Sequence, residues 1–559
     1  MKNIYFKYCL LLILISVSNN YFAIAQNQLD ETALEKINLF TDRNLYITGE
    51  YINFSAIIHS TDSGLIQKSK VIYVDVISDG NRIICQNKVL IHENKINGSI
   101  LIPDKCITGY YYLRAYTKLM RNYGHSNFAY VLLKIINHKK KNFLHTKNIF
   151  EQAIDSNQSI IPETENQILL NINKKVYKYR DTIHLSIKNY EEVKKLNLVC
   201  ISVVPKFSLN NSIVRVPSFH NPSQIKYKAE TEGISISGQL IDKNTSKPLI
   251  YNGVYLSQVA DKNMIPSHTD SIGRFNFCLR NQYGKKNIVF TSEVKNSETE
   301  PVFLIDNDFE KVPEDISFPI FKLTKQERET AYTMAVNQQL KNIYYSKLSF
   351  KKDSAITQAA FYSKPDRIVN FNDYISLNSM SDYFTEIDLP VKIIKKNKKR
   401  EFQVKGTQAE LFIYKPLLLL DWVVIQDAED ILALSPQSIS SIEIINSAYL
   451  RGEFIFGGII NFISKNNDFA GIDFHSSTIA IDYDFFSNLN NKDIIQSKEK
   501  TIPDVRNTLF WKCFSGNHKQ TKTKFDIIAG DTPETYTIIL KGIDKNGNEI
   551  KSKTEFEVK

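Results

Sequence analysis

Short apolar segments separated by turn residues set the strongest limit on what this chain can fold into. Val71–Ser78, Tyr110–Tyr116 and Tyr536–Leu540 are rich in β-branched and aromatic residues, and glycine, asparagine and aspartate lie between such segments. This pattern favours strands over helices and is typical of sandwiches. With 43% apolar and 23% charged residues, the 559-residue chain is long enough for several globular domains. We therefore predict a mainly β fold of tandem β-sandwich domains.

The amino terminus has the pattern of an export signal. Two lysines accompany the apolar run Tyr8–Val17, and Ala23-Ile-Ala25 supplies the small residues of a cleavage site. We expect a signal peptide at 1–25, because the apolar run is shorter than the ~20 residues of a membrane anchor, which is the alternative. Cys9 lies inside the run, which argues against a lipoprotein site. We expect an exported protein, periplasmic or outer-membrane-associated, that meets the membrane only through a partner.

Cysteine spacing and charge argue against several classes of function. The six cysteines occur singly, which favours buried thiols over a disulfide framework or a metal site, and Cys85–Cys106 is the pair to examine for a bridge. The formal net charge is +10, yet an exported basic protein meets anionic lipid or glycan before nucleic acid, so we expect no nucleic acid partner. No His-Glu-x-x-His, Gly-x-Ser-x-Gly or phosphate-loop motif occurs. We expect no catalytic residue, no metal, no cofactor and no enzymatic activity; an unrecognised enzyme is the alternative.

An internal repeat connects two parts of the chain. Asn44–Ser55 matches Lys175–Ser186 at a fixed offset of 131 residues, which indicates two tandem copies of one sandwich type. The first copy contains Phe40–Tyr46, Gly49-Glu50 and Gly109–Thr117, and it resembles the macroglobulin-type sandwich of bacterial envelope proteins. Macroglobulins proper trap proteases through a Cys-Gly-Glu-Gln thioester. No cysteine here is followed by glycine, so we expect that chemistry to be absent.

A third sandwich is indicated downstream of the repeat. Ile236–Asp242, Lys247-Pro-Leu249 and Thr269–Phe277 resemble the carboxypeptidase regulatory-like domain, a seven-stranded sandwich. Phe275 and Phe277 alternate with polar residues and should share one face of a strand that follows a tight turn. The resemblance implies no catalytic role.

The segment near the carboxyl terminus resembles the plug of a TonB-dependent outer-membrane receptor. Pro416–Asp421, Ile431–Ile445 and Gly457–Phe462 predict a strand, a short helix and two further strands. The stretch after Phe474 is too short for a barrel of about 22 strands, so we expect a plug-like domain without a barrel. Receptors usually carry Asp-Gly after the first strand. This chain has Asp421-Trp422, and since tryptophan lacks the freedom of glycine to take positive φ, we expect a different turn.

The candidate partner-binding surface lies on this plug-like segment. Trp422 is either buried or an exposed aromatic anchor of the kind that dominates interfaces. If it is an anchor, Trp422→Ala should weaken partner capture and leave the melting temperature nearly unchanged. The expected partner-binding residues are Asp421, Trp422, Gln426, Asp427, Glu429 and Asp430.

A helix and a basic hairpin are predicted between the third sandwich and the plug-like segment. Thr324 and Glu327 form a capping box, and we interpret the helix that follows as a docking helix between domains. Five positive charges in Lys395–Arg400 should lie at a hairpin tip, either as a solvated turn or as a grip for phosphate or lipid headgroups. The apolar stripe expected to dock the helix consists of Tyr332, Val336, Leu340 and Ile343.

Together these features predict tandem β-sandwich domains, then a small α+β plug-like domain and terminal β-strands. We expect a non-catalytic envelope protein that binds an outer-membrane or periplasmic protein, with docking at the periplasmic face of the outer membrane to a partner or transporter. The alternative is a transport accessory protein that binds a peptide or glycan directly. The expected parts are a signal peptide (1–25), a macroglobulin-type sandwich (26–140), a second macroglobulin-like sandwich (165–230), a regulatory-like sandwich (232–300), a linker with a helix (301–360), the plug-like domain (361–475) and terminal sandwich strands (500–559).

Overall fold

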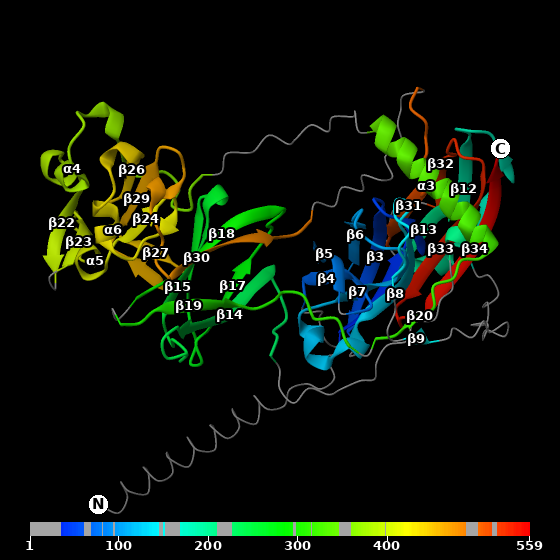
Figure 1. Cartoon of the computed structure of the whole chain (residues 1–559), viewed down its shortest axis with the longest axis horizontal. Coiled ribbons are helices and arrows are strands. Elements are labelled where there is room, and N and C mark those ends of the chain that lie inside the picture. Colours follow the sequence, from blue (N-terminus) through cyan, green and yellow to red (C-terminus); the bar gives the residue numbers. More distant parts are fainter. Residues whose placement is uncertain are drawn as a thin grey trace, which may run out of the picture. The chain divides into compact units, whose positions relative to one another are not determined.

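The computed structural model describes residues 35–60, 69–80, 82–92, 95–144, 149–150, 168–209, 226–294, 298–314, 316–345, 359–396, 399–487, 501–516 and 523–559. The expected signal peptide lies outside these residues. The fold is mainly β, as predicted, and the chain forms two compact units (Figure 1). Unit 1 comprises Met1–Thr231, Lys311–Leu348 and Leu489–Lys559, and unit 2 comprises Glu232–Glu310 and Ser349–Asn488. Across the described part of the chain, no helix combines the length and apolar character of a membrane span.

Unit 1 begins with a sandwich that we call sandwich 1. Its two sheets have the orders β1-β3-β6 and β2-β8-β7-β4-β5. Tyr46, Phe54 and Leu113 are fully buried between the sheets, so the alternating apolar pattern of the strands forms the core. The strands are β1 (Glu35–Thr41), β2 (Leu45–Ile47), β3 (Tyr51–Ser60), β4 (Val71–Ser78), β5 (Arg82–Leu90), β6 (Lys95–Leu101), β7 (Gly109–Tyr116) and β8 (Ala129–Ile136).

Sandwich 2 combines two distant parts of the chain. Its sheets have the orders β10-β12-β32 and β11-β34-β33-β13-β31, and Figure 1 shows β32 beside β12 and β31 beside β13. The prediction of a contiguous domain at 165–230 followed by separate terminal strands at 500–559 is therefore wrong, because both segments share one core. The strands are β10 (Leu169–Ile172), β11 (Val176–Tyr177), β12 (Thr182–Lys188), β13 (Leu196–Pro205), β31 (Phe510–Phe514), β32 (Lys524–Ile528), β33 (Glu534–Asp544) and β34 (Glu549–Val558).

The structure confirms the internal repeat, since the two sandwiches have the same strand order and register. Asn38 pairs with Ile57 in sandwich 1, and 131 residues later Leu169 pairs with Lys188. The Tyr46 hydroxyl donates to Asp42 Oδ1 at 2.7 Å, and the Tyr177 hydroxyl donates to Asn173 Oδ1 at the same distance. Both copies therefore use the same local hydrogen bond where the first sheet passes into the second.

One hairpin of the repeat is opened in sandwich 2. In sandwich 1, β4 ends at Ser78 and β5 begins at Arg82. The equivalent strands β13 and β31 end at Pro205 and begin at Phe510, and all of unit 2 lies in the chain between them. Cys200 and Cys513 are opposite one another in these two strands and form a disulfide with a sequence separation of 313. The expected preference for free thiols is wrong for this pair, while Cys85 and Cys106, the pair singled out for a bridge, are free.

Helix α3 (Lys325–Tyr345) packs in unit 1, and its predicted cap is confirmed. The Glu327 amide donates to Thr324 Oγ1 at 3.1 Å, and the Thr324 amide donates to Glu327 Oε2 at 2.8 Å. The predicted docking stripe is wrong, because Tyr332 is 74% exposed. The residues that pack against Leu45 and Ile47 of β2 are instead Ala331, Met334 and Ala335. The face of α3 that packs on β2 is therefore the one that carries two alanines and a methionine.

The sandwich of unit 2 is also completed by a distant strand. Its sheets have the orders β17-β14-β19 and β16-β15-β18-β30. Phe275 and Phe277 share one face of β17, as predicted, and both are buried. β19 falls in the expected linker 301–360 and β30 follows the plug-like segment, so the expected boundary at residue 300 is corrected. The strands are β14 (Ile234–Asp242), β15 (Gly253–Gln258), β16 (Asn263–His268), β17 (Arg274–Leu279), β18 (Lys285–Ser292), β19 (Pro301–Ile305) and β30 (Thr478–Asp484).

The rest of unit 2 is a small α+β domain, which we define as residues 361–475. Its main sheet has the order β21-β26-β29-β24-β25, and β22 and β23 form the predicted basic hairpin. Ile442, Ile444 and Phe462 are fully buried beneath the helices. The elements are β21 (Arg367–Asn370), α4 (Met380–Glu386), β22 (Val391–Lys396), β23 (Lys399–Val404), α5 (Glu410–Ile413), β24 (Leu417–Leu420), β25 (Val423–Val424), α6 (Ala428–Leu432), β26 (Ile439–Ile445), β27 (Tyr449–Arg451), β28 (Phe454–Phe456) and β29 (Ile459–Ser464).

Candidate functional site

The turn at Asp421 and Trp422 keeps the backbone conformation that Asp-Gly would give. Leu420 pairs with Val423, so the two residues alone connect β24 to β25. Their φ angles are 47° for Asp421 and 65° for Trp422, and positive φ at both positions is the pattern of a type I′ hairpin turn. Our expectation of a different turn is therefore wrong. Tryptophan adopts a conformation that costs roughly 1–2 kcal/mol for a residue with a side chain, so its contacts must offset that cost.

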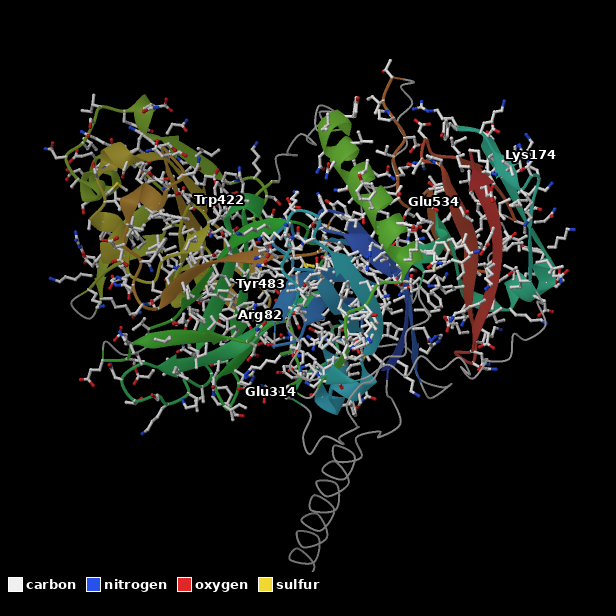
Figure 2. The ribbon with its side chains drawn as sticks, turned by 45° about the vertical axis from the view of Figure 1, so that its right-hand side comes forward. Arg82, Lys174, Glu314, Trp422, Tyr483 and Glu534 are labelled. Atoms are coloured by element: carbon white, nitrogen blue, oxygen red, sulfur yellow. A yellow bond between two sulfur atoms is a disulfide. The ribbon has the colours of Figure 1, made fainter. Side chains whose placement is uncertain are left out.

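Those contacts bury the Trp422 side chain, which is 6% exposed. Figure 2 labels Trp422. The indole Nε1 donates to the Tyr362 hydroxyl at 3.2 Å, and the Lys262 ammonium lies 4.8 Å from the ring centroid. Lys262 belongs to the sandwich of unit 2, and Tyr255 and Met264 of that sandwich share one apolar cluster with Trp422. The ring therefore joins the α+β domain to the neighbouring sandwich within the same chain and is not a free surface anchor.

Asp421 is fully buried and holds the same turn from its other side. Its carboxylate accepts hydrogen bonds from the Ser464 amide at 2.8 Å, the Ser464 hydroxyl at 2.6 Å and the Phe469 amide at 3.0 Å. Ser464 ends β29, the strand beside β24. These three donors satisfy a buried carboxylate without a cation. Asp421 is thus a structural residue of the sheet, and its side chain is not accessible to a partner.

The charged loop after the turn faces the basic hairpin. Asp427 lies 3.0 Å from Lys399 Nζ, and Glu429 accepts from Arg400 Nε at 2.9 Å. Partial burial raises the pKa of Asp427, but the hydrogen bond from the Glu429 amide and the Lys399 charge outweigh it and leave that pKa below its usual value. Asp430 lies 3.2 Å from His475 Nε2. Of the six predicted partner-binding residues, Gln426 is exposed. The acidic residues of the loop and the basic residues of the hairpin, which are separate in the sequence, pair with each other.

The pairing of these charges argues against an acidic loop that is free to bind a partner, and against a hairpin tip whose charges are all free to bind phosphate or lipid headgroups. Asp427 also caps α6, because its Oδ1 accepts from the Glu429 amide at 3.0 Å, so its carboxylate has a local role. Lys399 and Arg400 of the hairpin tip have carboxylate partners, whereas Lys395 and Lys396 are exposed. Exposed pairs of this kind contribute about 0–1 kcal/mol each. In the hairpin, carboxylates therefore neutralise the charges of Lys399 and Arg400, while Lys395 and Lys396 form a short basic surface.

The surface of the α+β domain also presents apolar side chains that the sequence reasoning did not select. Phe412 and Ile413 of α5 are 55% and 70% exposed. Leu450 and Ile455 are opposite each other in the β27–β28 hairpin and are 69% and 41% exposed. Tyr449 and Phe456, on the other face of that hairpin, pack with the Trp422 cluster. Alternation along β27 and β28 was the signal that could have separated the inward from the outward residues.

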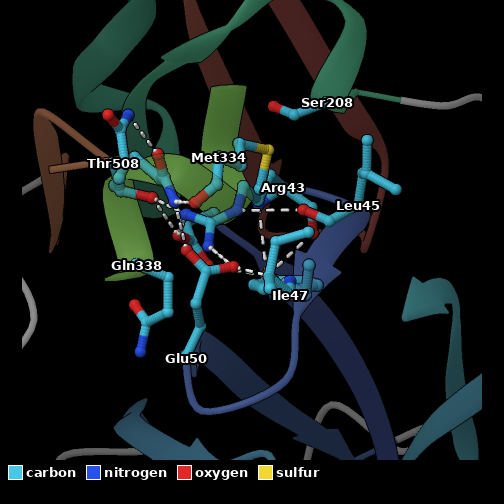
Figure 3. A network of polar contacts seen from close by, with 12 residues as sticks. Arg43, Leu45, Ile47, Glu50, Ser208, Met334, Gln338 and Thr508 are labelled. Atoms are coloured by element: carbon cyan, nitrogen blue, oxygen red, sulfur yellow. Dashed lines mark hydrogen bonds and ion pairs between the residues drawn. The ribbon is translucent and has the colours of Figure 1, made fainter. Parts of the chain in front are cut away.

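A second polar site lies in unit 1, and we call its residues Asp42, Arg43, Glu50, Asn507 and Thr508 the clamp (Figure 3). All five are buried. Arg43 lies 2.8 Å from Glu50 and 3.4 Å from Asp42, and it also donates to the Thr508 hydroxyl. Burial opposes the charge of Arg43, but Glu50 and Asp42 outweigh it and raise its pKa above the usual value.

The clamp joins three segments that are far apart in the chain. Thr508 Oγ1 donates to Asp42 at 2.5 Å, and Asn507 Nδ2 donates to Glu50 at 2.6 Å. Asn507 Oδ1 accepts from Asn337 of α3 at 2.8 Å. Sandwich 1, the approach to β31 in sandwich 2 and helix α3 therefore meet here. The motif Phe40–Tyr46 with Gly49-Glu50 thus provides buried structural contacts, with its carboxylates occupied by Arg43, Asn507 and Thr508.

The side chains of these sites pack, pair and form hydrogen bonds within the chain. The Cys200–Cys513 pair is oxidised, and the clamp carboxylates are paired with a cation and with hydrogen-bond donors. In the part of the chain that the structure describes, no group of three or more His, Cys, Asp or Glu residues could hold a metal ion. The expectation of no cofactor stays a prediction.

Comparison with known proteins gives only distant structural likenesses. No family model and no curated protein matches the sequence. The Salmonella alpha-2-macroglobulin reacted with methylamine matches at 10% identity with a TM-score of 0.16, over 94% of this chain and 23% of that one. The Escherichia coli alpha-2-macroglobulin activated by porcine elastase matches at 8% identity with a TM-score of 0.22, over 94% and 44%. The D0-D1 domain of intimin matches at 10% identity with a TM-score of 0.14, over 48% and 94%. The chain spans less than half of either macroglobulin, and at such scores the description of the fold rests on the strand pairing above.

Proposed function

We propose that this protein is a non-catalytic, exported scaffold that docks to another protein of the bacterial envelope at the periplasmic face of the outer membrane. In this proposal sandwiches 1 and 2 are macroglobulin-type, the sandwich of unit 2 is regulatory-like and the α+β domain is plug-like. The docking surface is the outward pair of the β27–β28 hairpin together with α5. The expected anchor Trp422 is replaced in this role, because its ring is used within the chain.

The observation that carries the proposal is the exposed apolar surface of the α+β domain. Leu450 and Ile455 are cross-strand neighbours that share one face, and both are more than a third exposed. The Gly457 amide, directly after this hairpin, donates to the Lys415 carbonyl at 2.9 Å, just beyond α5. The segments that carry the two exposed apolar pairs therefore meet at Gly457. Contiguous apolar side chains on a soluble surface mark interaction sites.

Rigidity adds to the suitability of this surface for docking. An ideal Cβ at Gly457 would lie 2.2 Å from the Tyr414 carbonyl oxygen, so only glycine permits this approach of the hairpin to α5. The inward residues Tyr449 and Phe456 anchor the hairpin on the Trp422 cluster. A surface that is already ordered loses little conformational entropy when a partner binds. The hairpin thus combines exposed apolar groups with a fixed backbone.

Cross-linking and pull-down of the full mature chain from envelope fractions tests the proposal. Leu450→Ser with Ile455→Ser should reduce capture of a discrete partner by about 30-fold, the effect of losing ~2 kcal/mol of binding at a central residue. Ile272→Ser is the matched control, because Ile272 is 57% exposed in the sandwich of unit 2. All variants should keep the melting temperature of the parent, since exposed positions contribute little to stability.

Two results would contradict the docking proposal. One is unchanged capture by the Leu450 and Ile455 variant at wild-type stability. The other is repeated recovery of no discrete envelope protein, together with calorimetric binding of a peptide or oligosaccharide by the isolated chain. The second result would favour the transport accessory role.

A further inference from the structure

The hairpin β13–β31 of sandwich 2 has no turn of its own. Its equivalent in sandwich 1 runs directly from Ser78 to Arg82, whereas unit 2 lies in the chain between Pro205 and Phe510. Among the described strands, β31 is the edge strand of its sheet and pairs with β13 alone. An edge strand of five residues without a tight turn depends on long-range contacts for its register.

The Cys200–Cys513 disulfide lies one pair from the end of this strand pair that is farther from the missing turn. The two cysteines are directly opposite each other, between the pairs Val199–Phe514 and Val203–Phe510 that end the ladder. Cys200 is 1% exposed and packs with residues of sandwich 1, including Phe40 and Ile57, while Cys513 is only partly buried. The bridge therefore holds together covalently two strands that no turn connects, and Cys513 is the more exposed of its two residues.

The position of β31 also sets the position of the clamp. Asn507 and Thr508 stand immediately before β31, and the Leu509 amide donates to the Val203 carbonyl of β13 at 2.9 Å. These two residues supply the hydrogen bonds to Glu50 and Asp42. If β31 separates from β13, the clamp loses both donors and leaves carboxylates with unsatisfied acceptor capacity in the interior.

We propose that Cys200–Cys513 is a redox-sensitive latch that replaces the missing hairpin turn, and that its reduction by a dithiol releases β31 and loosens the clamp. A thiolate of the dithiol attacks Cys513 Sγ, the S–S bond breaks, and Cys200 leaves as a thiolate that takes up a proton. The second thiol of the reductant then attacks the mixed disulfide. It releases Cys513 as a thiol and leaves the reductant as its own disulfide, so that two electrons and two protons pass to the protein.

Hydrogen exchange of the full mature chain, with and without dithiothreitol, tests the latch. The folded protein is first treated with dithiothreitol and is then denatured and alkylated. Alkylation should show that Cys200 and Cys513 became free thiols before denaturation. Amide exchange should then accelerate by about tenfold both in 507–514 and in 42–53, as expected for local opening, and stay constant in β14 and β17. Cys200→Ala with Cys513→Ala should show the same acceleration without reductant. Cys278→Ser, which replaces an exposed cysteine outside the disulfide, is the control and should change neither segment.

Each other outcome overturns the latch. If the bridge is reduced and only 507–514 accelerates, the disulfide is a staple without influence on the clamp. If native dithiothreitol treatment leaves the bridge intact, or if neither segment responds in the reduced protein or in the double variant, the disulfide is not redox-sensitive in the folded chain or is not needed for the register of β31.

Discussion

Replacement of Trp422 tests whether its ring is a structural anchor between the two domains of unit 2. Removal of a buried tryptophan side chain costs about 3–5 kcal/mol, and Trp422→Ala keeps the strained positive φ of 65°. Trp422→Gly loses the same ring but relieves the backbone, so it should be about 1 kcal/mol more stable than the alanine variant. The order wild type, glycine variant, alanine variant is therefore expected.

Scanning calorimetry measures the effect on the unfolding of unit 2. The chain has two tryptophans, which lie in different units, so unit 1 can be followed separately in each variant. Trp511 fluorescence reports unit 1 and should be unaffected. A loss of about 3 kcal/mol should lower the melting temperature of unit 2 by about 6–12 °C for a unit of this size. An unchanged transition of unit 2, or a glycine variant no more stable than the alanine variant, would refute the reasoning. The original expectation of lost partner capture at constant melting temperature would then return.

Three further predictions concern unit 1. Burial lowers the pKa of Lys541 from 10.5 to about 8, so between these values the unfolded chain holds a proton that the folded chain has lost. The free energy of unfolding in urea should therefore rise between pH 8 and 10. Lys541→Met should flatten this rise and increase the free energy of unfolding by up to about 3 kcal/mol at pH 7. Arg43→Met should lower the free energy of chemical unfolding by about 3–5 kcal/mol, because two buried carboxylates lose their cation. Adding Asp42→Asn and Glu50→Gln should recover most of this loss, and no recovery would show that packing dominates. Thr324→Ala should lower the free energy of unfolding by about 1 kcal/mol, and Thr324→Ser should lower it much less. Equal losses in the two variants would argue against the cap.

Sequence alone sufficed for features that depend on neighbouring residues. The capping box at Thr324 and Glu327 spans three residues, and the internal repeat was visible as matching residues at a fixed offset. Strand segments follow from their β-branched and aromatic residues, and the alternation of Phe275 and Phe277 assigned one face. The positive charges of the basic hairpin and the acidic loop were likewise visible, although not their pairing.

Tertiary structure alone decided what depends on distant partners. The pairing of β13 with β31, the Cys200–Cys513 bridge and the completion of the unit 2 sandwich by β30 join segments that no local pattern relates. A strand of five residues shows the same pattern whichever sheet accepts it, and an apolar side chain shows the same hydropathy whether it faces a neighbouring domain or water. For this reason the sequence left the burial of Trp422 open, and it placed the exposed stripe of α3 on the wrong side of the helix. Their burial is set by the shape of the surface opposite them, which only the folded chain contains.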